Sequence, residues 1–345
     1  MKKILLGVSA AMMLTSSVIA QDIHYTQYFT SPLTLNPALT GLVQNDVRFS
    51  ANYRTQWAAV SSNPYITGTV AFDIATLKGK LPEGDALGLG LLGLYDKSGE
   101  GGLQNTSVGL SAAYHKAFGG SKQHTISLGV QGMLVTKNLD FTKLRFEDQF
   151  DAATGGTPYS TKETFGTADL SYADFNAGVM YSGHVSEHAT AYAGFSYYHL
   201  TEPVETFQSS NHQIHSRQTA YLGGSFDLNE NMVLYSSALY QAQASATEVL
   251  VGAAVGFVLN PGHDLEYRKN TIFYLGGWYR YGDAVSPYIG LGWAKMQLGV
   301  SYDVNISSFT PATGGAGAYE LSLTFNGNIN KRADQPHYNF ACPKF

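Results

Sequence analysis

The sequence is poor in cysteine, in charged residues and in long apolar runs. Cys342 is the single cysteine among 345 residues, so the chain has neither a disulfide framework nor a cysteine cluster for a metal ion. Charged residues are only 14% of the chain and the formal net charge is -5, which makes it a poor candidate for nucleic-acid binding. Beyond residue 20, no apolar run approaches the 18 residues of a membrane-spanning helix. If the chain enters a membrane, it does so as strands.

The first twenty residues have the three parts of a secretory signal peptide. Lys2 and Lys3 give a positive start, residues 4–14 are largely apolar, and Val18-Ile19-Ala20 ends in a small residue. The apolar part is too short and too interrupted by hydroxyl residues for an uncleaved anchor. We therefore expect residues 1–20 to be a signal peptide and the mature chain to begin near Gln21.

What is abundant points to strands with two different faces. The chain has 37 glycines and 23 tyrosines, well above the usual soluble composition. The clearest segment is 296–305, MQLGVSYDVN, in which apolar and polar residues alternate strictly. Segments 319–326 and 249–259 repeat the pattern. Ten alternating residues match a tilted membrane strand, with one face toward lipid and one toward the lumen.

Candidate strands recur along the chain, and their number is even. We count fourteen, at about 46–57, 64–76, 86–96, 103–117, 123–136, 168–182, 189–202, 213–227, 232–244, 247–259, 270–281, 285–293, 295–305 and 317–326. An even count is typical of bacterial single-chain barrels, although imperfect alternation leaves twelve or sixteen open. Long connections at 137–167, 203–212 and 306–316 alternate with short ones such as 184–188, and the one exception is the long connection 260–269, which falls on the side of the short turns.

These features predict an all-β protein: a transmembrane antiparallel β-barrel of about fourteen strands over residues 46–326, in the outer membrane. Long connections would face outward and short turns would face the periplasm. Aromatic residues near strand ends, among them Trp57, Trp278 and Tyr281, are expected in the interfacial girdles. A soluble β-sandwich or solenoid is the alternative, but it would carry charge where this chain has Gly, Ser, Gln, Asn and Tyr.

Motifs for catalysis are missing or lie in the wrong context. Residues 88–93 spell G-x-G-x-x-G, but inside an alternating strand, whereas a dinucleotide site needs a strand-to-helix turn. His184 and His188 bracket a predicted tight turn without an acidic third ligand. The chain has no G-x-S-x-G element. We therefore expect no enzymatic activity, no cofactor and no metal.

The connection 137–167 is long enough to be functional. It combines apolar and acidic residues, among them Leu144, Phe146, Asp148 and Phe150. Apolar anchors ringed by charge suit a partner at the cell surface, and they equally suit a loop that folds back into the lumen as a plug.

Short motifs in a fixed order resemble the PorP/SprF membrane proteins of the type IX secretion and gliding machinery of Bacteroidetes. They are Gln27-Tyr28-Phe29, Ser31-Pro32-Leu33, Asn36-Pro37-Ala38-Leu39-Thr40-Gly41, Tyr53-Arg54-Thr55-Gln56-Trp57, Phe72-Asp73, Lys143-Leu144-Arg145-Phe146, Asp148-Gln149-Phe150, Tyr302-Asp303-Val304-Asn305-Ile306-Ser307, Gly317-Ala318-Tyr319-Glu320-Leu321-Ser322-Leu323 and Cys342-Pro343-Lys344-Phe345. Each is weak alone, but the ordered set spans the mature chain.

The resemblance implies a non-enzymatic outer-membrane barrel, in contact with lipid, that helps to export or anchor a secreted surface protein. The implied partners are components of the type IX apparatus, a large adhesin with a C-terminal sorting domain, or both. The alternative is a channel for small hydrophobic solutes similar to the FadL-like barrels, which also have an N-terminal hatch with an Asn-Pro-Ala motif like Asn36-Pro37-Ala38 here.

The segment Gln27 to Gly41 has no strand or helix period, yet it is rich in apolar residues. Pro32 and Pro37 exclude a membrane strand because proline lacks the ladder donor. We expect residues 21–45 to form a plug or periplasmic seal, with Gln27, Tyr28, Phe29, Asn36, Pro37 and Gly41 in the lumen. The expected wall contacts are Tyr53, Arg54, Gln56, Trp57 and Asp73, with an ion pair between Arg54 and Asp73.

The end of the chain is expected to leave the barrel. Residues 319–326 have the form of a closing strand with a terminal aromatic residue. Residues 327–345 would then form a periplasmic tail, and Cys342, Pro343 and Phe345 are candidate docking residues for the secretion apparatus.

Overall fold

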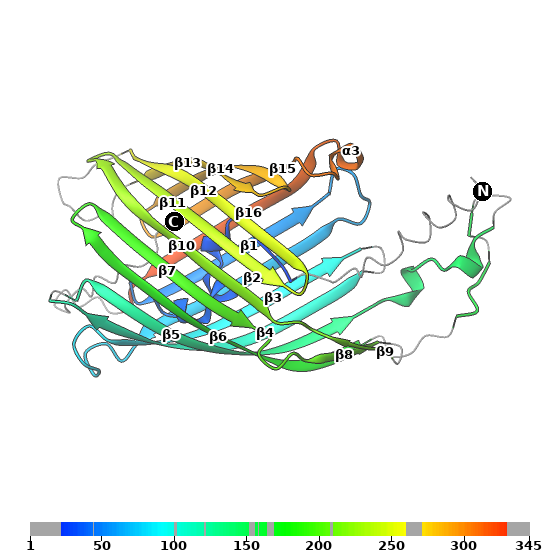
Figure 1. Ribbon diagram of the computed structural model, residues 1–345, viewed down its shortest axis with the longest axis horizontal. Helices are drawn as coiled ribbons and strands as arrows, with labels where there is room; N and C mark the ends of the chain where they lie inside the picture. The colour runs from blue at the N-terminus through cyan, green and yellow to red at the C-terminus, as the bar shows by residue number, and fades with distance from the viewer. Residues whose placement is uncertain are drawn as a thin grey trace, which may run out of the picture.

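Fourteen strands form a closed antiparallel barrel in the computed structural model (Figure 1). The structure describes residues 22–43, 45–99, 102–120, 122–151, 156–157, 159–163, 169–207, 210–259 and 271–329. The barrel strands are β1 (Val47–Gln56), β2 (Tyr65–Thr76), β3 (Ala86–Ser98), β4 (Leu103–Phe118), β5 (His124–Asn138), β6 (Asp169–Ser186), β7 (Ala189–Tyr198), β10 (Arg217–Asn229), β11 (Met232–Gln243), β12 (Ala246–Val258), β13 (Ile272–Arg280), β14 (Ala284–Trp293), β15 (Met296–Asn305) and β16 (Ala316–Gly327).

Each barrel strand pairs with the strands before and after it, and β1 pairs with β16 to close the barrel. The prediction of a fourteen-stranded barrel is confirmed, and the strand bounds fall within a few residues of those expected. One difference lies between β7 and β10, where a connection was expected. There β8 (Val204–Phe207) and β9 (Ser210–Gln213) form a separate hairpin outside the barrel wall.

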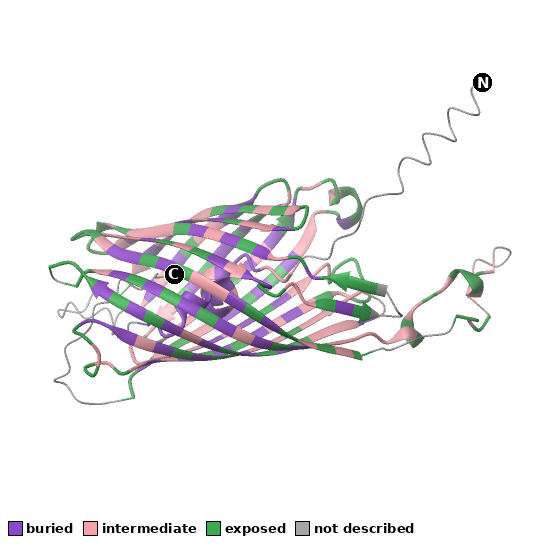
Figure 2. Cartoon of the chain, turned by 60° about the horizontal axis from the view of Figure 1, so that its bottom comes forward, coloured by how far each residue is buried: buried purple, intermediate pink, exposed green. Residues whose placement is uncertain are grey.

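Exposed and buried residues alternate along the strands (Figure 2). In β15, Val300 and Val304 are exposed, whereas Ser301, Asp303 and Asn305 are buried. Because successive side chains point to opposite faces of a sheet, the apolar set forms the outer surface and the polar set lines the lumen. Within the described ranges, no helix is long and apolar enough to cross a membrane.

Three of the long connections lie at one end of the barrel, whereas the long connection at 260–269 falls outside the described residues. The β8–β9 hairpin, the short helix α3 (Thr310–Thr313) and the β5–β6 connection lie at this end (Figure 1). The β5–β6 connection contains the 3-10 helices η3 (Phe141–Lys143) and η4 (Glu147–Gln149). It projects away from the barrel in Figure 1 and does not fold back into the lumen. We call this the loop end and the opposite one the turn end.

Three short helical turns precede β1 and lie inside the barrel: η1 (Tyr28–Thr30), α2 (Pro32–Leu35) and η2 (Pro37–Leu39). Pro32 and Pro37 each stand in the first turn of a helix, where the missing N–H costs no hydrogen bond. The side chain of Asn36 caps η2 by accepting a hydrogen bond from the Ala38 N–H at 2.8 Å. The two prolines that prevent a strand therefore start the turns that replace it.

Candidate functional site

The lumen is occupied by residues 22–43, which we call the lumenal segment. Near the loop end, the Asp22 N–H donates to Gln243 Oε1, at the end of β11, at 2.8 Å. Near the turn end, the Gly41 N–H donates to the Asp73 carboxylate at 2.7 Å. Between these ends Leu33 and Ala38 are fully buried. The segment therefore runs along much of the barrel interior.

Strand glycines give the lumenal segment room to approach the wall. A Cβ atom at Gly129 would overlap the backbone of Pro37 and Ala38, and one at Gly88 would overlap the Thr40 carbonyl. Gly88 begins the G-x-G-x-x-G stretch, which lies inside β3 and not at a nucleotide-type turn; Gly88 and Gly90 face the lumen, whereas Gly93 shares the outward face with Leu89 and Leu91. Absence of side chains at these positions is what allows two backbones to meet.

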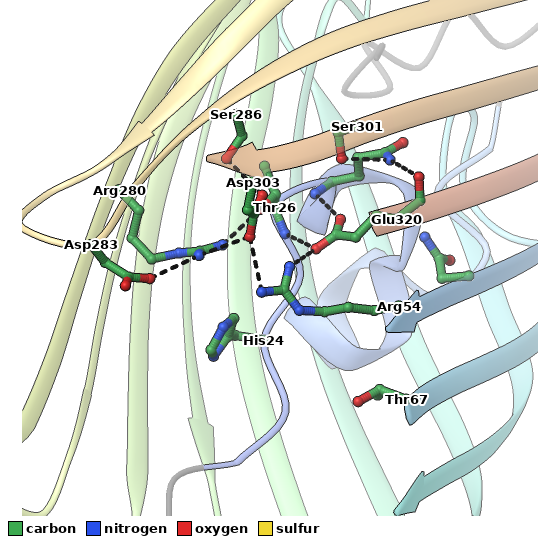
Figure 3. Close-up of polar contacts among 12 residues, drawn as sticks. His24, Thr26, Arg54, Thr67, Arg280, Asp283, Ser286, Ser301, Asp303 and Glu320 are labelled. Atoms are coloured by element: carbon green, nitrogen blue, oxygen red, sulfur yellow. Dashed lines mark hydrogen bonds and ion pairs between the residues drawn. The ribbon is translucent and has the colours of Figure 1, made fainter. Parts of the chain in front are cut away.

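Glu320 of β16 holds the backbone at the start of η1 (Figure 3). Its two carboxylate oxygens accept hydrogen bonds from the N–H groups of Thr26 and Gln27, at 2.7 and 2.9 Å. The Gln27 amide also donates to Ser301 at 2.9 Å and accepts from Ser322 at 2.7 Å. Since the segment makes no ladder with the wall, these side chains satisfy backbone groups that would otherwise be buried without partners.

Two arginines neutralise the carboxylates at this point (Figure 3). Arg54 of β1 forms ion pairs with Glu320 and, at 2.9 Å, with Asp303 of β15. Arg280 of β13 pairs with Asp303 at 3.1 Å and donates to the Thr26 hydroxyl at 2.6 Å, and Thr26 in turn donates to Asp303 at 2.8 Å. All five residues are buried. We call Arg54, Arg280, Asp303 and Glu320 the charge cluster.

The expected ion pair between Arg54 and Asp73 is wrong. In the β1–β2 register, Arg54 lies opposite Thr67, whereas Asp73 lies opposite Arg48. Arg48 and Asp73 form an ion pair at 2.6 Å, and Arg48 also donates to the Leu39 carbonyl at 2.9 Å. Arg54 lies directly opposite Glu320, because barrel closure makes β16 the other neighbour of β1.

Two further expected wall contacts are also wrong. Tyr53 points outward and is 46% exposed. Consecutive residues of a strand point to opposite faces of the sheet, so Tyr53 cannot share the lumenal face with Arg54. Trp57 follows β1 with a φ of 60° and stacks on Phe309, so it belongs to the rim at the loop end. Gln56 shares the lumenal face with Arg54, but no hydrogen bond to the lumenal segment is found for it in the described part of the chain.

Aromatic side chains of the lumenal segment and of the wall pack together in the lumen. Phe29 packs against Trp278 and Tyr288, with ring centroids 5.1 and 5.9 Å apart, and Tyr28 meets Phe29 edge to face. Trp278 is only 1% exposed, so its expected place in an interfacial girdle is wrong. Its strand position points inward, where it packs on the lumenal segment.

Asn36 attaches the middle of the lumenal segment to the barrel wall. Its amide nitrogen lies within 3.2 Å of the carbonyl oxygens of Val179 and Phe195 and of the Tyr221 hydroxyl. A Cβ at Gly178 would overlap the Asn36 side chain. Farther along, Thr40 places its carbonyl 2.8 Å from His115 Nε2. Asn36 therefore caps the turn η2 that begins at Pro37 and also binds three strands of the wall, β6, β7 and β10.

The candidate partner residues lie in the projecting β5–β6 connection, away from the lumen (Figure 1). Phe150 is 55% exposed, and Leu144 and Phe146 are half-buried. Asp148 is exposed and accepts hydrogen bonds from Thr161 and from the Lys162 N–H. The candidate tail residues Cys342, Pro343 and Phe345 lie outside the described residues.

The arrangement holds residues 22–43 of the chain itself against the barrel wall. Among the described residues, no group of three or more His, Cys, Asp or Glu side chains is placed to hold a metal ion. Sequence reasoning missed Arg48 and Arg280 and did not join Asp303 and Glu320 to the segment. These residues could have been found from the sequence, because each is a charged residue on the inward face of an alternating strand. Such residues are few in a chain with only 14% charged residues, and a buried charge needs a partner.

Comparisons with known proteins give a family and several distant barrels. A family model described as "Type IX secretion system membrane protein PorP/SprF" matches residues 17–325. No curated protein matches the sequence. The structure is similar to three solved structures. They are the toluene transporter TbuX of Ralstonia pickettii (12% identity, TM-score 0.46, 86% of this chain and 91% of that chain), the toluene transporter TodX of Pseudomonas putida (9%, 0.46, 86% and 92%) and the translocator domain of the autotransporter NalP from Neisseria meningitidis (10%, 0.40, 82% and 89%).

The charge cluster predicts very different effects for two carboxylates that pair with the same arginine. Asp303 is buried, whereas the side chain of Asp283, also 3.1 Å from Arg280, is 45% exposed. We expect Asp303→Asn to lower the free energy of unfolding by about 3 kcal/mol, because it removes the buried carboxylate that Arg54 and Arg280 share and leaves part of their charge uncompensated. Asp283→Asn should cost less than about 1 kcal/mol. Urea unfolding of the protein in lipid, followed by heat-modifiable gel mobility, measures both; equal midpoints would contradict the role of the cluster.

The close approach of Pro37 and Ala38 to Gly129 predicts that a large side chain on the lumenal face of β5 displaces the lumenal segment. We expect Gly129→Leu to make residues 22–43 sensitive to chymotrypsin, which cleaves after Tyr25, Tyr28 and Phe29, because the new side chain needs the space of Pro37. Gly132→Leu on the outward face is the matched control, since a Cβ there meets only the Phe175 ring at 3.6 Å. Mass spectrometry of the fragments reports cleavage, and equal protection of both variants would count against this seating.

Proposed function

Since the chain belongs to the PorP/SprF family of type IX secretion system membrane proteins, we propose that it is an anchoring barrel that binds a secreted surface protein and helps to export or display it. The protein is an outer-membrane component of that system. Its own contribution is binding and not chemistry. The partner we propose is a large adhesin-type protein with a C-terminal sorting domain, an apparatus component, or both.

The observation that carries this proposal is the filled lumen. The lumenal segment runs through the barrel from Asp22 near the loop end to Gly41 near the turn end, so a solute would have to pass beside it or displace it. The charge cluster, the Arg48–Asp73 pair and Asn36 attach the segment to widely separated strands. We propose that the lumenal segment is a plug, which makes the barrel a rigid support for whatever binds at its rims.

The binding surface we propose is the loop end. Exposed apolar side chains project there from separate elements: Phe150 from the β5–β6 connection, Val204 from β8 and Phe309 beside α3 are 54–55% exposed. Asp148 and its neighbour Glu147 add negative charge beside Phe150. Exposed aromatic anchors ringed by charge are typical of protein-binding surfaces.

A channel for small apolar solutes is the second candidate. One observation favours it: a cavity of about 190 Å³ remains beside the lumenal segment, and Leu92, Met133 and Val135 are among its lining residues. Transport would require the segment to move, because the same cavity is also lined by Asp22 and Thr34. Solute flux in the absence of any protein partner would favour this candidate.

Deleting residues 27–41 tests the plug. We expect the shortened barrel, reconstituted in planar bilayers, to conduct ions more readily than the intact protein, because the deletion removes the parts of the segment that contact β1, β3, β5 and β6. A deletion of residues 144–150 in the projecting connection is the control and should leave conductance low. Equal conductance of the two deletions, with both barrels heat-modifiable, would contradict the plug.

Affinity purification from gently solubilised outer membranes tests the anchoring role. We expect a large surface protein with a sorting domain, or apparatus components, to be recovered by mass spectrometry with the intact barrel. Replacing Leu144, Phe146 and Phe150 by Ser should reduce recovery of a surface protein several-fold, because these side chains would lose contact area.

Val185→Ser, in the last residues of β6 at the turn end, is the matched control, since Val185 is 67% exposed and lies far from the loop end. If the folded barrel is recovered alone and at full yield, the anchoring role loses its support and solute transport becomes the function to test.

A further inference from the structure

The cavity beside the lumenal segment has an apolar wall and an acidic rim. Its wall includes Leu92 of β3, Met133 and Val135 of β5 and Ile214 after β9, all at most 9% exposed. The cavity of about 190 Å³ is larger than the roughly 150 Å³ that suffices for benzene in an apolar protein site. Four carboxylates line it as well: Asp22, Asp96, Asp174 and Glu205.

Partners within the protein account for only part of this negative charge. Glu205 of β8 forms an ion pair with Lys137 of β5. Asp22 lies 2.7 Å from His199 and 3.3 Å from Arg217. Lys137 and Arg217 are the permanent cations on the cavity wall.

His199 directly follows β7 and lies between two carboxylates. Burial lowers its pKa, but Asp22 and Asp174 outweigh that effect and raise the pKa from 6.5 to about 9. Even with His199 protonated, the four carboxylates outnumber the three cations Lys137, Arg217 and His199 by one, and His212 and His215 also line the cavity. Carboxylates are therefore the most numerous charged groups on the cavity wall.

Two carboxylates have unused acceptor capacity. Asp174 is 2% exposed, and one oxygen lies 2.9 Å from His199 Nδ1, while the other, Oδ1, is buried without a hydrogen-bond partner among the described residues. Asp96 accepts a hydrogen bond from the Thr67 hydroxyl at 2.6 Å, and within the described ranges it has no ion-pair partner. A buried carboxylate oxygen without a donor is costly, and a ligand donor at that place would remove the cost.

The β8–β9 hairpin closes one side of this cavity. Glu205 and His212 come from its two strands, and the Lys137–Glu205 pair joins it to the barrel wall. Ile214 is held by a backbone hydrogen bond from its N–H to the Pro203 carbonyl at 2.9 Å. The hairpin therefore makes an enclosed site out of one part of the lumen.

We propose that this cavity binds an organic monocation, a protonated amine on a short apolar chain, with the chain against Leu92, Met133 and Val135 and the ammonium group on Asp174, which lies level with Met133 and Leu92 in the barrel wall. A lysine side chain of a bound polypeptide and a free alkylamine share this chemistry. The proposal goes beyond the anchoring role, because amine binding is measurable without any protein partner.

Calorimetric titration of the full chain in lipid nanodiscs, with empty nanodiscs subtracted, tests the proposal. The probes are n-hexylamine, hexan-1-ol and hexanoate, which share one apolar chain and differ in charge. We expect hexylamine to bind about 10- to 100-fold more tightly than hexanol, as is typical of hydrogen bonds to a charged group, and hexanoate to bind least. Equal binding of the three probes would overturn the proposal, and so would no binding, which would mean that only water occupies the cavity.

Two substitutions locate the charge. Asp174→Asn keeps the shape and removes the negative charge, so the preference for hexylamine over hexanol should fall to about one. Asp96→Asn leaves the Asp174–His199 contact intact and should reduce the preference several-fold, which keeps the test available if Asp174→Asn does not fold. Asp283→Asn, an exposed carboxylate on another ion pair, is the control and should change nothing. An unchanged preference in both cavity variants would overturn the assignment.

A pair of short peptides distinguishes the two sources of the amine. One carries a free lysine and the other carries Nε-acetyllysine at the same place. Tighter binding of the lysine peptide than of hexylamine, lost on acetylation, would assign the cavity to a polypeptide side chain. Binding of hexylamine alone would assign it to free amines. Failure of partner recovery with amine binding intact would refute the anchoring role and leave this site standing.

Discussion

The ion pairs of Arg54 and Arg280 with Asp303 and Glu320 hold the interior of this protein together. Each charge is buried, and a buried charge without a partner costs several kcal/mol. The four residues come from β1, β13, β15 and β16, so their compensation depends on a closed barrel. Glu320 also accepts the N–H groups of Thr26 and Gln27. The same interaction that satisfies the wall therefore fixes the start of the lumenal segment.

The lumenal segment and the barrel wall each supply the contacts that the other lacks. A segment with two prolines leaves backbone groups unpaired, and a barrel of this size leaves space unfilled. Polar side chains of the wall supply the missing donors and acceptors, as with the Leu33 carbonyl, which accepts from Gln131 at 3.1 Å. Wall glycines such as Gly129 remove the bulk that would keep the two backbones apart. Neither part is satisfied alone, which is why an apolar but irregular segment is stable inside a polar lumen.

Apolar, paired and unpaired polar side chains occupy different parts of the molecule. The outer face is apolar, most of the lumenal charges have ion-pair partners, and one oxygen of Asp174 in the cavity near the loop end has no hydrogen-bond partner among the described residues. Phe150, Val204 and Phe309 are exposed at that same end, where the projecting connection, the hairpin and α3 lie. In the function that we propose, the filled barrel is the support and the elements at its rim carry the recognition.

The sequence by itself determined the strands, their number and which face of each is apolar, because period-two alternation is a local property that needs no knowledge of neighbours. The ordered motifs likewise indicated the family from residues alone. Only the tertiary structure decided which side chains meet. Arg54 pairs with Glu320 because closure brings β1 beside β16, which lies more than 260 positions later in the chain. Tyr53 faces lipid because Arg54 faces the lumen. Trp278 packs on Phe29, and Asp174 keeps a free oxygen beside an apolar wall, because of contacts between segments that no local pattern connects.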